Sequence, residues 1–122
     1  MSPRPPAPRF VIRASADRAE LAVHGELDAS NTVELHDAVS RAGPGHGFCV
    51  IDLTRATYLD SAGINTLFRL HRELTRAGIR LHLVAPTGSC PRYALNLVCA
   101  HDVMPVHDGI AGARAAVNGG GC

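Results

Sequence analysis

Hydrophobic positions change their spacing several times along the chain, which predicts short strands alternating with helices. Apolar residues at Phe10–Ile12 and Leu21–Val23 flank a polar stretch and predict two antiparallel strands. The apolar positions that follow recur three and four residues apart, as on one face of a helix: Leu35, Ala38, Val39 and Ala42. Asn31 and Glu34 have the spacing of a capping box at the start of this helix, and Gly43–Pro44 predicts its end.

The middle of the chain repeats the alternation of strand and helix. The continuous apolar run Phe48–Ile51 predicts a buried central strand, which a short polar turn follows. A second helix is predicted from about Asp60–Ser61 to Gly78, with an apolar stripe at Ile64, Leu67, Phe68, His71 and Leu74. Arg80–Ala85 alternates and then becomes apolar, which predicts a further strand.

The last third predicts two more helices around one strand. Ser89 is the expected cap of a third helix that carries Pro91 in its first turn. Val103–Val106 predicts a short final strand, and Asp108 is the expected cap of a last helix that runs through Ile110, Ala113 and Val117. The resulting order, β-β-α-β-α-β-α-β-α, is typical of a largely parallel sheet covered by helices, and hence of the α/β class.

Length and composition predict a single soluble domain that binds no nucleic acid directly and does not cross a membrane. The chain has 122 residues, of which 46% are apolar, and we expect a domain over residues 10–117. A Pro-rich disordered tail is expected at 1–9 and a Gly-rich flexible tail at 118–122. A net charge of +1 argues against direct nucleic-acid binding, and no apolar run approaches the ~20 residues of a membrane span.

Nothing resembling an export signal opens the sequence, so we expect a cytoplasmic protein. In that reducing compartment its four cysteines should be thiols: Cys49, Cys90, Cys99 and Cys122. Cys90 and Cys99 are nine positions apart, roughly 13 Å along a helix, which is too far for a disulfide within that helix.

The sequence matches none of the common catalytic motifs. The chain contains no lysine and neither of the common glycine-rich phosphate loops. Its seven histidines are scattered, and no pair of cysteines has metal-binding spacing. We therefore expect a protein that is not an enzyme and that needs no metal or cofactor.

One segment departs from this plain pattern, at the start of the second helix. Val50–Ile64 passes from the buried strand through the polar turn into a helix that opens with Ser61 and Gly63. Local physics favours a structural role, in which Ser61 caps the helix and Asp60 interacts with its dipole. Alternatively, Ser61 is presented for modification, because a phosphate would meet the first-turn amides, and Gly63 keeps the surface bare for a partner.

Two motifs in order along the chain carry a resemblance to a known family. Gly25–Asp28, the strand Val50–Leu53 and Leu59–Ile64 resemble the signatures of the STAS domain of bacterial anti-sigma factor antagonists. Segments of the second half are similar to the family as well: Val84–Pro86, Leu95–Leu97 and Asp102–Val106. The resemblance covers about residues 10–117 and implies a small mixed sheet, mostly parallel, with about four packed helices.

The resemblance also implies a function and its residues. Ser61 matches the serine that a GHKL-type serine kinase, itself the anti-sigma factor, phosphorylates in the family. The implied partner-binding residues are Asp28, Asp60, Ser61, Ala62 and Gly63. The unphosphorylated antagonist binds the anti-sigma factor and so frees the sigma factor; phosphorylation ends binding, and a PP2C-type phosphatase restores it.

Two positions depart from the family pattern. Ala62 stands where many members carry a second hydroxyl, and Cys99 stands where a helix-ending glycine is usual. An alternative is a STAS subunit with a scaffolding role, as in a phospholipid-transport ABC assembly or a stressosome-like complex. Ser61 together with Asp28 and Asp60 favours partner switching over that alternative.

Overall fold

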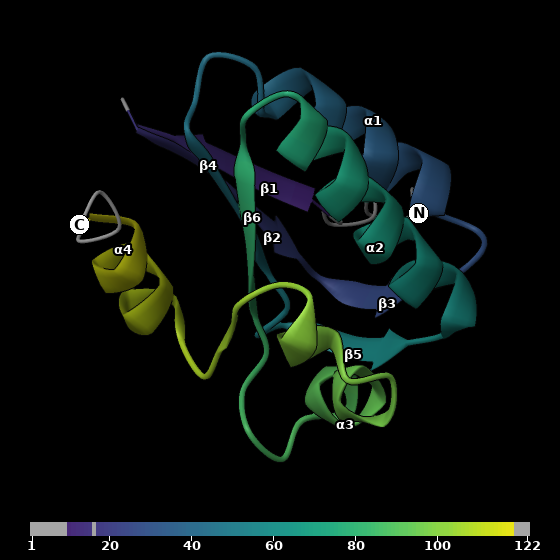
Figure 1. Ribbon diagram of the computed structural model, residues 1–122. Coiled ribbons are helices and arrows are strands. Elements are labelled where there is room, and N and C mark those ends of the chain that lie inside the picture. The colour runs from purple at the N-terminus through teal and green to yellow at the C-terminus, as the bar shows by residue number, and fades with distance from the viewer. Residues whose placement is uncertain (1–9, 16, 119–122) are drawn as a thin grey trace, which may run out of the picture.

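A computed structural model describes residues 10–15 and 17–118 (Figure 1). The tail expected at 1–9 lies outside the described residues, as do positions 119–122 of the tail expected at 118–122, and Cys122 with them; Asn118 itself is the last residue of a helix. In chain order the elements are β1 (Phe10–Ala14), β2 (Arg18–Val23), β3 (Gly25–Leu27), α1 (Thr32–Ala42), β4 (Phe48–Asp52), β5 (Ala56–Leu59), α2 (Ser61–Arg76), β6 (Arg80–Val84), α3 (Cys90–Leu97), a 3-10 turn (Ala100–Asp102), β7 (Val106–His107) and α4 (Ile110–Asn118).

A five-stranded mixed sheet forms the centre of the domain, in the order β1-β2-β4-β6-β7. β1 is antiparallel to β2, and the remaining neighbours are parallel. This arrangement and the four helices confirm the α/β fold that the sequence predicts.

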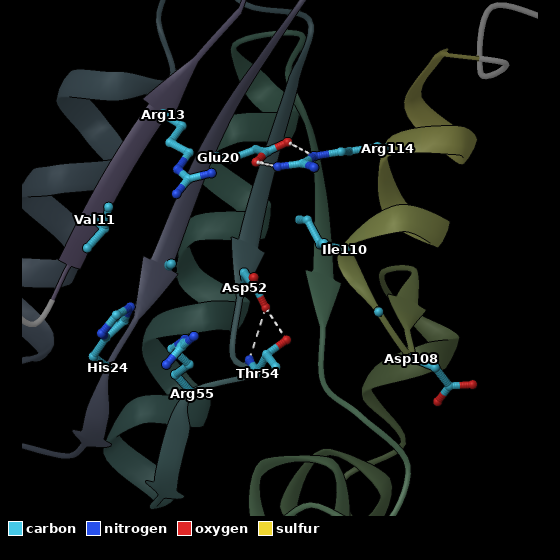
Figure 2. Close-up of a pocket in the computed structure, with 12 residues that line it drawn as sticks. Val11, Arg13, Glu20, His24, Asp52, Thr54, Arg55, Asp108, Ile110 and Arg114 are labelled. Carbon is cyan, nitrogen blue, oxygen red and sulfur yellow. Dashed lines mark hydrogen bonds and ion pairs between the residues drawn. The ribbon is translucent and has the colours of Figure 1, made fainter.

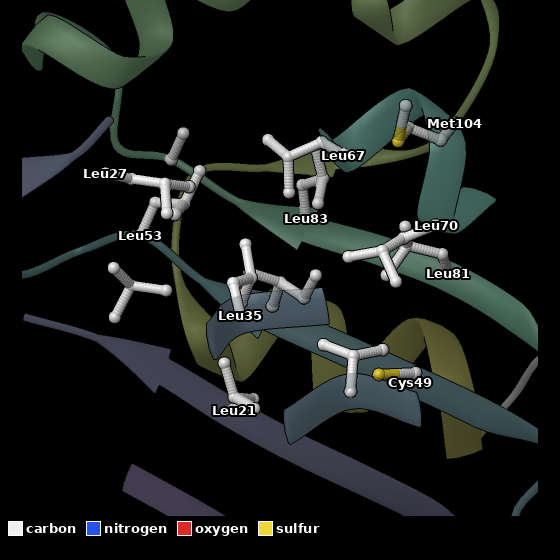
Figure 3. Packing of buried hydrophobic residues seen from close by; sticks show 14 of the residues in the cluster. Leu21, Leu27, Leu35, Cys49, Leu53, Leu67, Leu70, Leu81, Leu83 and Met104 are labelled. Atoms are coloured by element: carbon white, nitrogen blue, oxygen red, sulfur yellow. The ribbon is translucent and has the colours of Figure 1, made fainter. Parts of the chain in front are cut away.

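The main core lies between this sheet and helices α1 and α2, which cover the same face (Figures 1 and 3). Alternation along the strands explains the choice of face: Leu21 and Val23 of β2 point into the core, whereas Glu20 and Ala22 point to the other side. The core consists mainly of leucines from both strands and helices, including Leu27, Leu35, Leu53, Leu67, Leu70, Leu81 and Leu83. Cys49 lies in this core, and burial raises the pKa of its thiol to about 12.

The opposite face of the sheet is covered only in part, by α4. A small second cluster joins Val50 and Val84 of the sheet to Ala113 and Val117 of this helix. Arg114 also binds the carboxylate of Glu20 through two hydrogen bonds of 2.7 Å. Hydrogen bonds from Arg114 and Arg18 lower the pKa of Glu20 to about 2, so an ion pair holds α4 against β2.

Two short strands were not predicted from the sequence. β3 and β5 pair in parallel as a separate two-stranded sheet, where the sequence predicted only a polar turn before the second helix. In β5 only Ala56 and Leu59 are buried, so its sequence shows neither strict alternation nor a continuous apolar run. Elements this short leave too few positions for a period to be recognised.

The end of the chain also differs from the prediction. The final strand is Val106–His107 and not Val103–Val106, because a 3-10 turn precedes it and Met104 packs into the core. The last helix begins at Ile110, and among the described residues the Asp108 carboxylate accepts no hydrogen bond from the first turn of this helix. The Asp108 carboxylate accepts hydrogen bonds from Thr87 and Arg92 instead.

Of the three N-caps that the sequence predicts for the first three helices, the structure confirms one and shows that two are wrong. Ser89 caps α3 as predicted and accepts a hydrogen bond from the Arg92 amide at 3.2 Å. Asn31 precedes α1 but makes no side-chain cap, so the predicted capping box does not form. At α2 the cap is Asp60, whose carboxylate accepts from the Gly63 amide at 2.9 Å; Ser61 is the first helical residue.

Cys99 adopts a left-handed backbone conformation, with φ 53° and ψ 42°, where the chain leaves α3. Among the described residues it is the one non-glycine residue with positive φ. This conformation strains an L-residue and explains why a glycine suits the position.

Replacing the true cap should destabilise the domain, and replacing its neighbour should not. We expect Asp60→Ala to lower the free energy of unfolding by about 1 kcal/mol, the usual cost of a lost N-cap. Ser61→Ala should change it by less than about 0.5 kcal/mol, because this side chain is exposed and does not cap the helix. Urea denaturation of both variants measures the difference, and equal losses would contradict the assignment.

Relieving the strain at Cys99 should stabilise the domain. We expect Cys99→Gly to raise the free energy of unfolding by about 0.5–1 kcal/mol, because the relief of ~1–2 kcal/mol exceeds the entropic cost of glycine. Cys99→Ala is the matched control, since it removes the thiol but keeps the Cβ atom. Thermal and urea unfolding should show a gain only for the glycine variant; a gain for both would assign the effect to the thiol.

Candidate functional site

The pairing of β3 with β5 brings the predicted site residues to one edge. Leu27 of β3 and Leu59 of β5 are partners in a parallel register. The next residue of each strand is an aspartate, Asp28 and Asp60, so both carboxylates leave the small sheet at its carboxyl edge. The Asp60 amide also donates to the Leu27 carbonyl at 3.3 Å, which ties the two exits together.

Ser61 occupies the exposed first position of α2. Because the Asp60 carboxylate caps the helix, the Ser61 hydroxyl is left without a hydrogen bond to any described residue. No described base activates it, in contrast to the nucleophilic serine of a hydrolase. The hydroxyl is therefore accessible from solvent and has no structural task of its own within the described chain.

Gly63 has a packing role rather than a surface role. It is buried, and a Cβ atom built on it would lie 2.6 Å from Leu59 Cδ1 and 2.9 Å from the Leu27 carbonyl oxygen. Only glycine lets the first turn of α2 lie this close to the β3–β5 pair. The expectation that Gly63 keeps a surface bare is replaced by this contact, while Ala62 beside it stays half-buried.

A second loop, from Asp28 to Asn31, stands beside the start of α2 and was only partly foreseen. The Asp28 carboxylate accepts hydrogen bonds from both the amide, at 2.9 Å, and the hydroxyl of Ser30. Asn31 is only 3% exposed; its amide nitrogen donates to the Glu26 carbonyl at 2.7 Å, and its side-chain oxygen accepts from the Asp28 amide at 3.0 Å. These contacts fix the direction of Asp28.

Sequence reasoning assigned Asn31 to a helix cap and gave Ser30 no role. The spacing Asp28-x-Ser30 is the signal that could have revealed the loop, because an aspartate that binds the backbone two residues on makes an Asx turn. Local polar turns of this kind compete with capping for the same side chains.

The site is acidic and rests on the amino end of a helix. Asp28 and Asp60 contribute two carboxylates, and the positive end of the α2 dipole lies beneath Ser61. Such a surface suits recognition by another protein, with charge complementarity as the selecting force.

Metal-ligand clusters and membrane-spanning helices are absent from the described part of the chain. No group of three or more His, Cys, Asp or Glu side chains among the described residues could hold a metal ion. Within 10–15 and 17–118, no helix has the length and apolar character to cross a membrane. The described cysteines Cys49, Cys90 and Cys99 are free thiols.

Comparison with known proteins places these features in a family. A model of the STAS domain matches residues 11–113. Over 63 residues the chain is 33% identical to Osmosensory protein A of Mycobacterium tuberculosis (strain ATCC 25618 / H37Rv); the match covers 52% of this chain and 40% of that protein. The chain thus aligns with less than half the length of this relative.

Solved structures share the fold. An anti-sigma factor antagonist from Mycobacterium paratuberculosis superposes with a TM-score of 0.81 at 22% identity, over 89% of this chain and 92% of that one. The anti-sigma factor antagonist SpoIIAA in its unphosphorylated form gives a TM-score of 0.74 at 19% identity, over 90% of this chain and 96% of that one. Bacillus SpoIIAA in its phosphorylated form gives a TM-score of 0.67 at 19% identity, over 88% of this chain and 98% of that one.

At identities of 19–22%, similarity to these solved structures shows the fold alone. The family model covers most of the chain, and both signature segments lie where the fold brings them together, at the paired ends of β3 and β5. The chain belongs to the STAS domain family.

Proposed function

We propose that this STAS protein is an anti-sigma factor antagonist that acts by phosphorylation-controlled partner switching. In the unphosphorylated state, the surface around Asp28, Asp60 and Ser61 binds an anti-sigma factor and thereby releases a sigma factor. Phosphorylation of Ser61 ends that binding. The proposal extends the distant structural similarity to anti-sigma factor antagonists, one of which is known in a phosphorylated form.

The observation that carries the proposal is that Asp60, and not Ser61, caps α2. Asp60 caps α2, and so Ser61 offers an exposed hydroxyl that the helix does not use. A kinase needs an accessible acceptor, and a switch works best where modification leaves the fold intact. The exposure of Ser61 and the absence of a described hydrogen bond to its hydroxyl support the choice of this residue on both grounds.

Electrostatics gives the direction of the switch. A phosphate adds about −1.5 to −2 charge at neutral pH, next to a surface that already carries Asp28 and Asp60. The amino end of α2 partly compensates this charge within the free domain. A partner that docks against the neutral hydroxyl would have to desolvate the phosphate, so the added charge weakens the complex and not the domain.

The proposed cycle needs two enzymes besides the antagonist. A GHKL-type serine kinase, which is also the anti-sigma factor, adds the phosphate, and a PP2C-type phosphatase removes it. The cycle takes place in the cytoplasm, with neither nucleic acid nor membrane as a direct partner of this chain. A scaffolding STAS subunit would instead keep its partners whether or not Ser61 is modified, which makes the two functions separable.

We expect Ser61→Ala to bind the anti-sigma kinase but to accept no phosphate from it. Wild type should gain one phosphate and then bind several hundredfold more weakly, which corresponds to a cost of ~3–4 kcal/mol. Ser61→Asp should fold normally and bind poorly. Incubation with kinase and ATP, followed by intact-mass measurement and titration calorimetry, gives both quantities.

Ser40→Ala is the matched control, because Ser40 is an exposed serine on α1, away from the β3–β5 edge. It should be phosphorylated and released like wild type. A phosphate on Ser61→Ala, or equal affinity of the kinase for both forms of wild type, would remove Ser61 from the mechanism. Unchanged binding of all partners by every variant would favour the scaffolding role.

A further inference from the structure

The sheet carries a cavity of about 560 Å³ on the face opposite α1 and α2 (Figure 2). It is open because the apolar cluster of α4 covers only β4 and β6, whereas β2 meets this helix through the Glu20–Arg114 ion pair. Its volume lies in the range of small-molecule sites. The lining residues come from strands, strand ends and α4: Val11, Arg13, Glu20, Ala22, His24, Asp52, Thr54, Arg55, Asp108, Gly109, Ile110 and Arg114.

The cavity extends to the carboxyl ends of the parallel strands. His24 follows β2, Thr54 and Arg55 follow β4, and Asp108 follows β7. These three strands run in the same direction. Ligands of open α/β sheets bind in the crevice outside the carboxyl ends of the strands, and this end of the cavity has that position.

The carboxylates around the cavity are already engaged. Glu20 is paired with Arg114 and Arg18. Asp52 accepts hydrogen bonds from both the amide and the hydroxyl of Thr54. Asp108 is bound by Thr87 and Arg92, and in Figure 2 it points away from the cavity.

Two arginine side chains that line the cavity have no partner among the described residues. The guanidinium groups of Arg13 and Arg55 make no hydrogen bond or ion pair with a described residue. They lie on β1 and just after β4, on either side of the floor that Ala22 forms with Val11. Ile110 of α4 adds an apolar wall. The cavity therefore combines two guanidinium groups that have no described partner, the Asp52 carboxylate that is hydrogen-bonded to Thr54, and an apolar floor.

We propose that this cavity binds a small amphiphilic carboxylate, whose charged group pairs with Arg13 or Arg55 at one side of the floor and whose hydrocarbon part covers Val11, Ala22 and Ile110. Guanidinium groups bind carboxylates through planar pairs of hydrogen bonds, which gives the site its charge selectivity. The hydrocarbon part gains from leaving water on the apolar floor. This site is separate from Ser61 and does not rest on the proposed function.

Nuclear magnetic resonance titration of the full chain with octanoate tests the proposal. We expect saturable shifts of backbone amides around the cavity, at positions 11, 22, 24, 54, 55 and 110. Octanol, which has the same chain without the charge, and inorganic phosphate, which has charge without the chain, should each bind at least tenfold more weakly. Equal binding of octanol or of phosphate would overturn the proposal.

Two kinds of variant separate charge from space. The double variant Arg13→Gln with Arg55→Gln should weaken octanoate binding by about tenfold or more, and Ala22→Leu should abolish it by filling the floor. Arg72→Gln, an exposed arginine on α2 across the sheet, is the matched control and should bind like wild type. A well-dispersed spectrum of each variant shows that it is folded.

Retained affinity in either cavity variant would overturn the site. So would shifts that cluster on the exposed apolar residues of α3, Tyr93 and Leu97, because they would mark non-specific adsorption. Absence of saturable shifts with octanoate would overturn it as well.

Discussion

The contact of the first turn of α2 with the β3–β5 pair is the constraint on which the candidate site depends. Gly63 lies so close to the Leu27 carbonyl and the Leu59 side chain that no Cβ atom fits between them. The helix is thereby seated on two paired strands whose ends are in register. Because the contact is made by backbone and buried side chains, the polar residues that precede it are left at the surface.

The two faces of the main sheet have different functions in the fold. One face supports α1 and α2 through a leucine-rich core, and this core provides most of the buried apolar surface. The other face holds one short helix, which needs the Glu20–Arg114 ion pair in addition to its small apolar cluster. Strand β2 serves both faces, since Leu21 enters the core and Glu20 binds α4. The alternation of a single strand thus separates the packing of the domain from the cavity on its far side.

The sequence predicted the long elements because their periods extend over many positions. The stripe of α2 and the apolar run of β4 are signals of this kind, and both segments form the predicted elements. β3 and β5 were missed, because three or four residues cannot establish a period. Caps were less predictable, since Asn31 and Asp60 each had several backbone groups within reach and tertiary structure decided among them.

The sequence indicated which residues belong to the candidate site, but it did not indicate how they are arranged. The family signatures indicate Asp28, Asp60 and Ser61, but local physics alone assigned the cap to Ser61. The structure assigns it to Asp60. The burial of Gly63 depends on Leu27, which lies 36 positions earlier in the chain, so no local pattern could reveal it.

The position of the cap on Asp60 has a thermodynamic consequence. Linkage requires that a covalent group shifts the folding equilibrium only as far as its interactions differ between the folded and the unfolded chain. At Ser61 the attraction of a negative group to the helix end is opposed by its repulsion from the adjacent carboxylate, and no hydrogen bond of the hydroxyl is lost. Chemistry at this hydroxyl is therefore nearly uncoupled from folding. Proteases that act on unfolded chains would therefore degrade both chemical states of the free domain at nearly the same rate, so turnover of the free domain would hardly change the ratio of the two states.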